Sequence, residues 1–333
     1  MKRLLCIGFM LVCISAQMFA GGGKESESKK QEKANQTAIV IDNFNHITEY
    51  TKIPERVLPL SLGEAEMLAA LGLTDKIIAA GMGHDTLESI LPEYRNLIQS
   101  KPIMKEISLE YILSLNPDFI FTTAFRFFLD GFGTYDDYKK NNVHIYVTEG
   151  SYTENCSLEN TYNDILNIGA IFKVEQRAQS FVEKLKQREK TVAEKIKKVK
   201  PIKCCVFDSN EGNTLFTAGG TGLEHDIITR AGGTNIFASI NQHFAPGSIE
   251  QIIKENPDVF IIHEYEIAES GTHYLNDGQQ KINYLKNKKE LAGVSAIKNN
   301  RFIVIPLCSV FPGVQNLNAL ETIAKGLHPE SFN

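Results

Sequence analysis

Cysteine and long apolar runs are scarce in this 333-residue chain, and it has no excess of basic charge. Two of its six cysteines, Cys6 and Cys13, lie within the N-terminal segment 1–20, and the other four are too few for a disulfide-rich scaffold. The formal net charge is −5 at pH 7, so nucleic acid is not an expected partner. After Ala20, no apolar stretch is long enough to cross a bilayer.

The N-terminus carries the one extended apolar run. Lys2 and Arg3 precede apolar residues from Leu4 to Phe19, and the run closes on Ala20 and three glycines. This order is typical of a secretory signal peptide, so we expect cleavage near Ala20 and a mature chain in the periplasm. Loss of the two basic residues would change the net charge from −5 to −7. Cys13 leaves an alternative open, because Met10-Leu11-Val12-Cys13 loosely resembles a lipobox for lipid anchoring.

The remaining chain is divided by composition and length. Residues 21–36 are rich in Lys, Glu, Ser and Gln and are expected to form a disordered leader after the signal peptide of residues 1–20. About 300 mature residues exceed what a single core usually supports, which predicts two lobes. We place an N-terminal lobe at 37–172, a bridging helix at 173–200 and a C-terminal lobe at 201–333.

Short apolar runs bounded by turn residues alternate with helical patterns from residue 38 onward, which predicts an α/β fold with mainly parallel sheets. The predicted strands are 39–42, 57–60, 77–80, 119–122, 144–147, 203–207, 259–262 and 302–305, with weaker signals near Leu215 and Ile236. Cys204 and Cys205 lie side by side in one of these runs and point to opposite faces, so we interpret them as small buried residues and assign them no metal.

The longest helical pattern runs from Leu158 to about Val199, with a break predicted near Phe172. Its later part places apolar residues such as Ala178, Leu185 and Val192 on one stripe, with Lys, Arg and Glu elsewhere. The charged residues are therefore interpreted as a solvated face, and the stripe is predicted to pack across both lobes.

An internal repeat is the most informative feature. The segment 108–121 returns at 248–261, and six positions are identical when the two segments are aligned without a gap. In each copy a Ser is placed to cap a short helix, a Glu lies in its first turn, and Asn-Pro ends it before a buried strand. Two similar lobes follow from this repeat.

Together with Leu68–Ile78, Asp226–Phe237 and Ala324–Glu330, the two copies resemble the periplasmic binding proteins of ABC importers for siderophores, haem and cobalamin. The resemblance covers nearly the whole mature chain. It implies two Rossmann-like lobes with mainly parallel sheets, bridged by one long α-helix, with a ligand cleft between the lobes. It further implies a monomer that captures an iron chelate, haem or cobalamin-like ligand and delivers it to a permease dimer with its ATPase, without a cofactor of its own.

Ligands of parallel α/β sheets bind beyond the carboxyl ends of the strands, which nominates the residues of the cleft. Aromatic walls with one Arg would suit a large, flat or aromatic ligand with anionic groups, and Arg126 is the preferred anion contact. The predicted ligand contacts are His84, Thr123, Phe125, Arg126, Phe127, Tyr152, His243, Phe244, His263, Tyr265, Ser309 and Phe311.

Metal coordination is not predicted. His84, His243 and His263 could meet across the cleft, but their spacing matches no local metal motif, and ordinary hydrogen-bonded histidines are the simpler interpretation. Tyr152 or Tyr265 as a ligand to iron has no stronger support.

The repeat also predicts a docking surface. Glu110 and Glu250 begin equivalent helices, one on each lobe, and the resemblance implies that glutamates at this motif position dock into basic pockets of the permease dimer. Stabilisation of the helix dipole, worth about 0.3–1 kcal/mol, is the simpler role for the same carboxylates.

Other function classes find less support in the sequence. The glycine-rich segment Phe216–Gly222 lacks the Lys-Ser/Thr of a phosphate-binding loop, and no nucleophile elbow is present, so the chain is not expected to be an enzyme. An exported metal- or tetrapyrrole-handling enzyme or chaperone on a related two-lobed fold remains the alternative. An exported adhesin or scaffold would leave the aromatic cleft unexplained.

Overall fold

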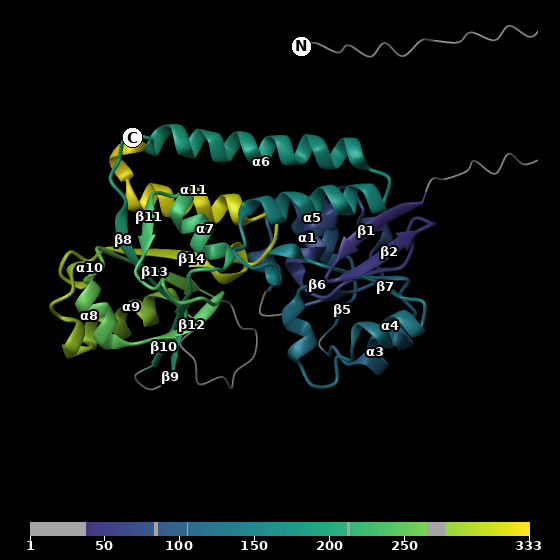
Figure 1. Cartoon of the computed structure of the whole chain (residues 1–333), viewed down its shortest axis with the longest axis horizontal. Coiled ribbons are helices and arrows are strands. Elements are labelled where there is room, and N and C mark those ends of the chain that lie inside the picture. Colours follow the sequence, from purple (N-terminus) through teal and green to yellow (C-terminus); the bar gives the residue numbers. More distant parts are fainter. Residues whose placement is uncertain (1–37, 83–85, 105, 212–213, 265–276) are drawn as a thin grey trace, which may run out of the picture. The chain divides into compact units, whose positions relative to one another are not determined.

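The computed structural model describes residues 38–82, 86–104, 106–211, 214–264 and 277–333. Within these residues, two α/β lobes follow one another along the chain, joined by a long helix (Figure 1). The fold class expected from the alternating pattern is therefore confirmed.

The first lobe is built on the parallel sheet β3-β6-β7. A short parallel pair, β4-β5, and an antiparallel pair, β1-β2, complete its strands. Its strands are β1 (Ile39–Asn43), β2 (His46–Tyr50), β3 (Val57–Pro59), β4 (Ala80–Gly81), β5 (Ile103–Met104), β6 (Phe119–Thr122) and β7 (His144–Val147). Its helices are α1 (Leu62–Ala70), α2 (Pro92–Gln99), α3 (Leu109–Ser114), α4 (Tyr135–Lys140) and α5 (Leu158–Ile171).

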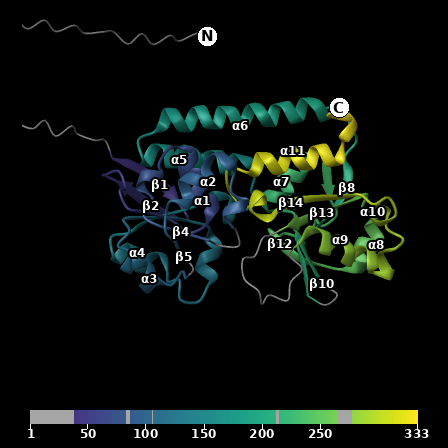
Figure 2. The ribbon, with the colours of Figure 1, turned by 180° about the vertical axis from the view of Figure 1, so that it is seen from behind.

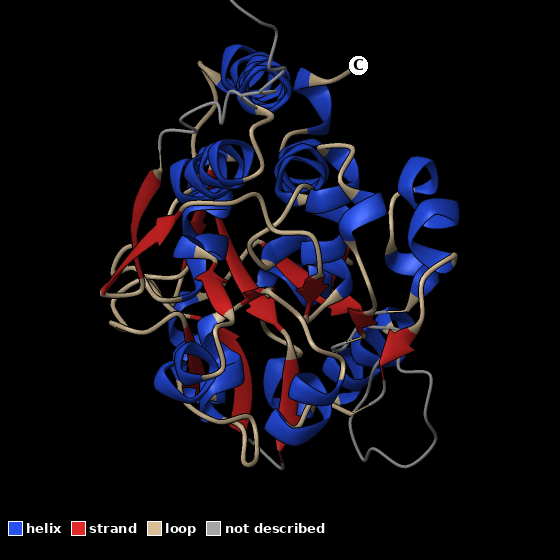
Figure 3. Ribbon diagram, turned by 90° about the vertical axis from the view of Figure 1, so that its right-hand side faces the viewer, coloured by secondary structure: helices blue, strands red, loops and turns tan. Residues whose placement is uncertain are grey.

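The second lobe is built on the parallel sheet β11-β8-β13-β14, beside an antiparallel sheet β12-β10-β9. Its strands are β8 (Ile202–Phe207), β9 (Ser209–Glu211), β10 (Thr214–Ala218), β11 (Gly233–Asn235), β12 (Phe244–Gly247), β13 (Val259–Glu264) and β14 (Phe302–Pro306). Its helices are α7 (Leu223–Arg230), α8 (Ile249–Glu255), α9 (Gly278–Asn287), α10 (Ser295–Lys298) and α11 (Asn316–Leu327). Helices lie on both sides of the strands (Figure 3).

The two repeat copies form equivalent units in separate sheets. Ser108 and Ser248 cap α3 and α8, each accepting a hydrogen bond from the backbone N–H three residues on. Asn116 and Asn256 follow these helices in the left-handed conformation, at φ 50° and 49°. Because Asn tolerates this conformation and Pro cannot continue a helix, each copy turns directly into its strand, β6 or β13.

The long helical pattern breaks where the sequence indicated. Phe172 ends α5, Lys173 takes a positive φ, and α6 (Glu175–Ile196) begins two residues later. Helix α6 lies alongside α5 of the first lobe and α11 of the second (Figures 1 and 2). Its buried residues are Ala178, Val182, Leu185 and Val192, and all of them except Val182 belong to the apolar stripe predicted from the sequence.

One hydrophobic core crosses the boundary between the lobes. A single cluster contains Ile165 and Ile168 of α5, the buried stripe of α6, and Ile227 and Leu320 of the second lobe. Two smaller clusters each belong to one lobe. The lobes are therefore joined by packed side chains as well as by the chain itself.

Buried polar contacts reinforce this boundary. The Gln315 side-chain amide donates to Glu66 Oε2 at 3.0 Å and to the Ser89 carbonyl oxygen at 2.8 Å. Thr161 Oγ1 donates to Asn316 Oδ1 at 2.8 Å. Breaking such a hydrogen bond in the interior is costly, because each buried partner has lost its hydrogen bonds to water and would be left without a replacement.

One predicted strand is shorter in the structure than the sequence indicated. The predicted strand 77–80 is reduced to β4, which starts at Ala80, and Ile77 makes only an isolated bridge to Val57.

Cys204 and Cys205 are fully buried, as interpreted from their apolar surroundings, and burial raises the pKa of Cys204 to about 12. Such thiols stay protonated and behave as small apolar side chains.

Candidate functional site

The strongest site candidate is a cavity of about 290 Å³ between the lobes, here called the outer pocket. Its walls follow β3 and β6 in the first lobe and β14 in the second, as expected for carboxyl ends of parallel strands. The lining residues are Ser61, Gly63, Glu64, Thr123, Phe125, Arg126, Leu129, Phe244, Cys308, Phe311 and Pro312.

Three phenyl rings from both lobes meet at this pocket. Phe125 comes from the first lobe, and Phe244 and Phe311 come from the second. Their ring centroids lie 6.0–6.1 Å apart in edge-on or tilted arrangements, the geometry that aromatic quadrupoles favour. This aromatic cluster offers a flat, apolar surface to a ligand that reaches both lobes.

Two charged side chains flank the aromatic surface. Arg126 donates from Nη2 to the Leu60 carbonyl oxygen at 3.0 Å, which orients its guanidinium. Because a guanidinium has five N–H donors, others remain for an anionic group of a ligand. Glu64, in the first turn of α1, is buried and also lines the pocket.

A second, much smaller cavity of about 10 Å³ adjoins the first and is here called the inner pocket. The two cavities share Phe125, Phe244, Phe311 and Pro312. The other residues of the inner pocket are Gly150, Gly222, Leu223, Glu224, His243 and Val310.

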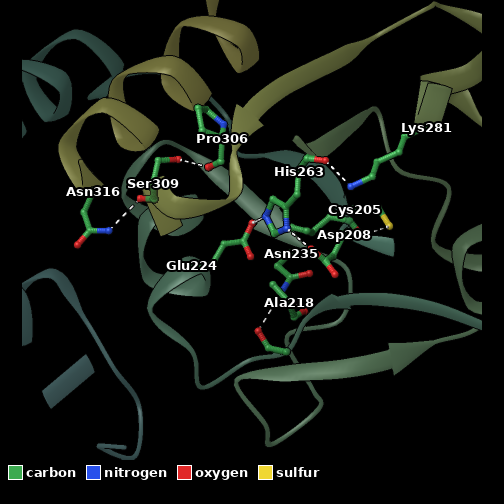
Figure 4. A network of polar contacts seen from close by, with 12 residues as sticks. Cys205, Asp208, Ala218, Glu224, Asn235, His263, Lys281, Pro306, Ser309 and Asn316 are labelled. Carbon is green, nitrogen blue, oxygen red and sulfur yellow. Dashed lines mark hydrogen bonds and ion pairs between the residues drawn. The ribbon is translucent and has the colours of Figure 1, made fainter. Parts of the chain in front are cut away.

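Glu224 connects the inner pocket to a network of charged side chains around His263 (Figure 4). His263 Nε2 is 2.8 Å from Glu224 Oε1, and its Nδ1 is 2.9 Å from Asp208 Oδ1. Burial alone would lower the pKa of His263, but the two carboxylates outweigh it and raise this pKa to about 9. The imidazole is therefore a cation at neutral pH and donates from both nitrogens.

Lys281 supports the same network from the other side. Its Nζ donates to the His263 carbonyl oxygen at 2.6 Å, and the residue is fully buried. Burial lowers the pKa of Lys281 to about 8, although the charges of Asp208 and Glu264 oppose the shift.

The structure brings five of the predicted ligand contacts together in the outer pocket: Thr123, Phe125, Arg126, Phe244 and Phe311. His243 lies at the inner pocket, with Nε2 3.2 Å from the Thr153 carbonyl oxygen and 3.5 Å from Cys156 Sγ. His84 and Tyr265 lie outside the residues that the structure describes. Contact with a ligand stays a prediction for the residues at these pockets.

Four predicted contacts are placed elsewhere. Phe127 stacks on Phe44 at 5.2 Å and packs edge-on against Phe132, within the first lobe. The Tyr152 hydroxyl accepts a hydrogen bond from the backbone N–H of Phe44 at 3.0 Å. We assign these two side chains a packing role, because neither lines the outer or the inner pocket.

His263 and Ser309 are also buried rather than exposed to a cleft. His263 has no exposed surface, and both of its ring nitrogens face carboxylates, so neither is left for a ligand. Ser309 is 1% exposed and donates to the Pro306 carbonyl oxygen at 2.6 Å. The rule that residues at strand ends line the cleft does not hold for these two residues. A strand end has one side that opens to the cleft and one side that faces the core, and the rule does not distinguish between them.

Sequence reasoning missed several pocket residues. Ser61, Gly63 and Glu64 follow β3, a strand that the sequence predicted, so the same rule could have nominated them. Glu224 carried no such signal, because it begins a helix that lies far from its partner His263 in the sequence.

The predicted docking carboxylates have equivalent settings. Glu110 and Glu250 are both exposed and lie in the first turns of α3 and α8. Within the described residues, no group of three or more His, Cys, Asp or Glu side chains is arranged to hold a metal ion. In the same part of the chain, no helix combines the length and apolar character needed to span a bilayer.

Comparisons with known proteins extend this description. A family model described as periplasmic binding protein matches residues 57–307. An ABC transporter substrate-binding lipoprotein of Bacillus subtilis is 22% identical over 326 residues, covering 96% of each chain. A vitamin B12-binding protein of Yersinia pseudotuberculosis is 24% identical over 225 residues, or 68% of this chain and 75% of the relative.

Among solved structures, a periplasmic binding protein from Veillonella parvula superposes with a TM-score of 0.77. It is 25% identical, and the match covers 88% of this chain and 98% of the other. The likeness extends over both lobes and the helix between them.

Proposed function

The chain belongs to the periplasmic binding protein family, and from this premise we propose that it is the substrate-binding component of an ABC importer. In this role it captures an iron chelate, haem or a cobalamin-like ligand and delivers it to a permease dimer with its ATPase. The similarity to an ABC transporter substrate-binding lipoprotein over almost the full length of both chains supports the proposal.

The observation that carries it is the outer pocket between the lobes. The aromatic cluster comes from both lobes, so a ligand that fills the pocket touches both at once. Aromatic walls with one guanidinium suit a ligand that has a flat apolar part and an anionic group. Such a pocket binds and orients, and the proposed role is non-catalytic.

The pocket volume bears on the choice of ligand. A cavity of about 290 Å³ lies at the small end of the range of roughly 300–1,000 Å³ for small-molecule sites. A ferric chelate or an edge of haem would use this space fully, whereas a cobalamin would extend well beyond it. The similarity to a vitamin B12-binding protein keeps cobalamin among the candidates.

Titration of the purified protein tests the proposal. The chain has 11 tyrosines and no tryptophan, so tyrosine fluorescence can follow binding of a ferric trihydroxamate, haem and cyanocobalamin. We expect Phe125→Ala and Arg126→Ala each to weaken binding of the saturating ligand by roughly tenfold or more.

Phe128→Ala is the matched control. Phe128 belongs to the same short helical turn as Phe125, but it is 84% exposed and lies outside both pockets. Unchanged affinity in both test variants, or an equal loss in the control, would refute the outer pocket as the ligand site.

Export and membrane attachment belong to the same proposal. We infer that residues 1–20 direct export to the periplasm and are cleaved near Ala20, with lipid attachment through Cys13 as the alternative. The lipoprotein relative makes the second route worth testing directly. Mass spectrometry of the mature protein separates the two, because only the lipidated form begins at Cys13 and carries acyl chains.

The docking role of Glu110 and Glu250 has its own test. Their exposed, equivalent positions on the two lobes suit contact with two subunits of a permease. We expect the double variant Glu110→Ala, Glu250→Ala to lose ligand uptake in cells and to bind ligand normally in solution. Normal uptake by that variant would refute docking through these carboxylates.

A further inference from the structure

Glu224 is the most unusual polar side chain near the ligand site. It is 1% exposed and lies in the first turn of α7. Its two carboxylate oxygens have different surroundings. Oε1 receives the hydrogen bond of His263, whereas Oε2 has no hydrogen-bond partner among the described residues.

An ionised oxygen without a partner is expensive in a protein interior. The desolvation of such a group costs roughly 1–3 kcal/mol, and more when it is charged. His263 compensates Oε1 at 2.8 Å, but no group compensates Oε2 among the described residues. The protein therefore keeps a hydrogen-bond acceptor with unused capacity in its interior.

This acceptor lines the inner pocket. Glu224 is one of its walls, and the aromatic cluster separates it from the outer pocket. A volume of about 10 Å³ is just enough for one group of the size of a water molecule, so the pocket admits a single nitrogen or oxygen. Its size excludes a ring or a carboxylate, and its charge disfavours any group that can only accept hydrogen bonds.

We propose that the inner pocket is a subsite for a hydrogen-bond donor of the ligand, an ammonium, N–H or hydroxyl group, which binds to Glu224 Oε2. The inference rests on the proposed function and specifies its ligand further: an anionic or flat part lies against Arg126 and the aromatic cluster, and a terminal donor reaches past the rings to Glu224. A bound ammonium would also gain from the faces of the surrounding phenyl rings.

The substitution Glu224→Gln inverts the polarity of the subsite at almost constant shape. Because His263 donates to position ε1, the amide oxygen faces His263 and the NH₂ group faces the inner pocket. A donor in the ligand would then meet another donor. We expect affinity for a donor-bearing ligand to fall roughly ten- to a hundredfold.

The test uses a matched pair of probes. Ferrioxamine B, a linear ferric trihydroxamate with a terminal ammonium, is compared with its N-acetylated form, whose acetyl group is too large for the inner pocket and keeps the amide N–H out of it. Haem and cyanocobalamin complete the set. We expect wild-type protein to prefer the ammonium chelate and Glu224→Gln to lose that preference. Glu250→Gln, which changes an exposed first-turn carboxylate of α8, should bind all probes as the wild type does.

The outcomes separate this inference from the proposed function. If the probe that binds the wild type most tightly binds Glu224→Gln with the same affinity, the donor subsite is overturned, but the receptor function still stands. Failure of all four probes to bind the wild type removes the receptor function as proposed, and the subsite with it. If Glu224→Gln does not fold, Glu224→Asp withdraws the carboxylate from the pocket and should show the same selective loss.

Discussion

The two repeat units share a scaffold and differ at the strand ends. In the first lobe, β6 ends at Thr122, and the next residue, Thr123, lines the outer pocket. In the second lobe, β13 continues to Glu264, and the residue that aligns with Thr123 in the repeat is the buried His263. The repeat therefore encodes the same architecture twice, whereas among the described residues only the first copy has its strand end at the outer pocket.

The difference has an electrostatic cause. Asp208, at the end of β8, and Glu224, on α7, hold His263 from two sides within the second lobe. Thr123 has no such pair of carboxylates bonded to it among the described residues, and it carries a short side chain. One strand end is thus held by a network of charged side chains, and the other lines the outer pocket.

The largest test of this contrast is stability. His263→Ala would remove the cation that lies between the buried Glu224 and the partly buried Asp208, and we expect a loss of about 3–5 kcal/mol of unfolding free energy at pH 7. Thr123→Ala at the equivalent position should cost no more than about 1 kcal/mol. Urea unfolding measures both, and equal losses would contradict the contrast between the lobes.

The pH dependence of stability should carry the signature of His263. Its folded-state pKa of about 9 lies above the unfolded value near 6.5, so its contribution is fully present below pH 6.5 and is lost as pH rises through 9. Unfolding free energy should fall above pH 6.5, with a slope of at most about 1.4 kcal/mol per pH unit for one proton.

Lys281 acts in the opposite direction at higher pH. Its lowered pKa of about 8 means that stability should recover as pH rises from 8 towards about 10.4, where the unfolded side chain loses its proton. The window from pH 6.5 to 8 therefore isolates His263. Urea titrations of wild type and His263→Gln in that window should differ in slope, and parallel profiles would contradict a charged imidazole.

The smallest effect concerns the two asparagines that end the repeat helices. Both have a positive φ, which Gly adopts readily, so Asn116→Gly should change stability by less than about 0.5 kcal/mol. Asn256 also accepts a hydrogen bond from the Ser295 N–H at Oδ1, at 2.8 Å. Asn256→Gly should therefore cost about 1 kcal/mol more than Asn116→Gly in the same unfolding assay.

Local signals made much of the fold predictable. Buried apolar runs marked the central strands, Ser108 and Ser248 marked helix starts, and the two Asn-Pro pairs marked their ends. The antiparallel sheet β12-β10-β9 was not predicted beyond a weak signal near Leu215 in β10, because its strands are short and β12 lies far from β10 in the sequence.

The outer pocket was predictable in part, from both lobes, whereas the buried network of His263 was not. Phe125 and Arg126 follow a strand end directly, so a local rule found them. The burial of His263 depends on Glu224, a residue that reaches it through the packing of α7 and not through any spacing in the sequence. Long-range partners of this kind follow from tertiary structure alone.

The core that crosses the lobe boundary has a mechanical consequence. Because α5, α6, α7 and α11 contribute to one cluster, a wide separation of the lobes would expose side chains such as Ile168, Leu185 and Leu320 to water. The lobes are therefore connected by a shared hydrophobic core and not only by a flexible segment of chain. We therefore expect ligand binding to change the structure by small shifts of the loops around the outer pocket, while these four helices stay packed together.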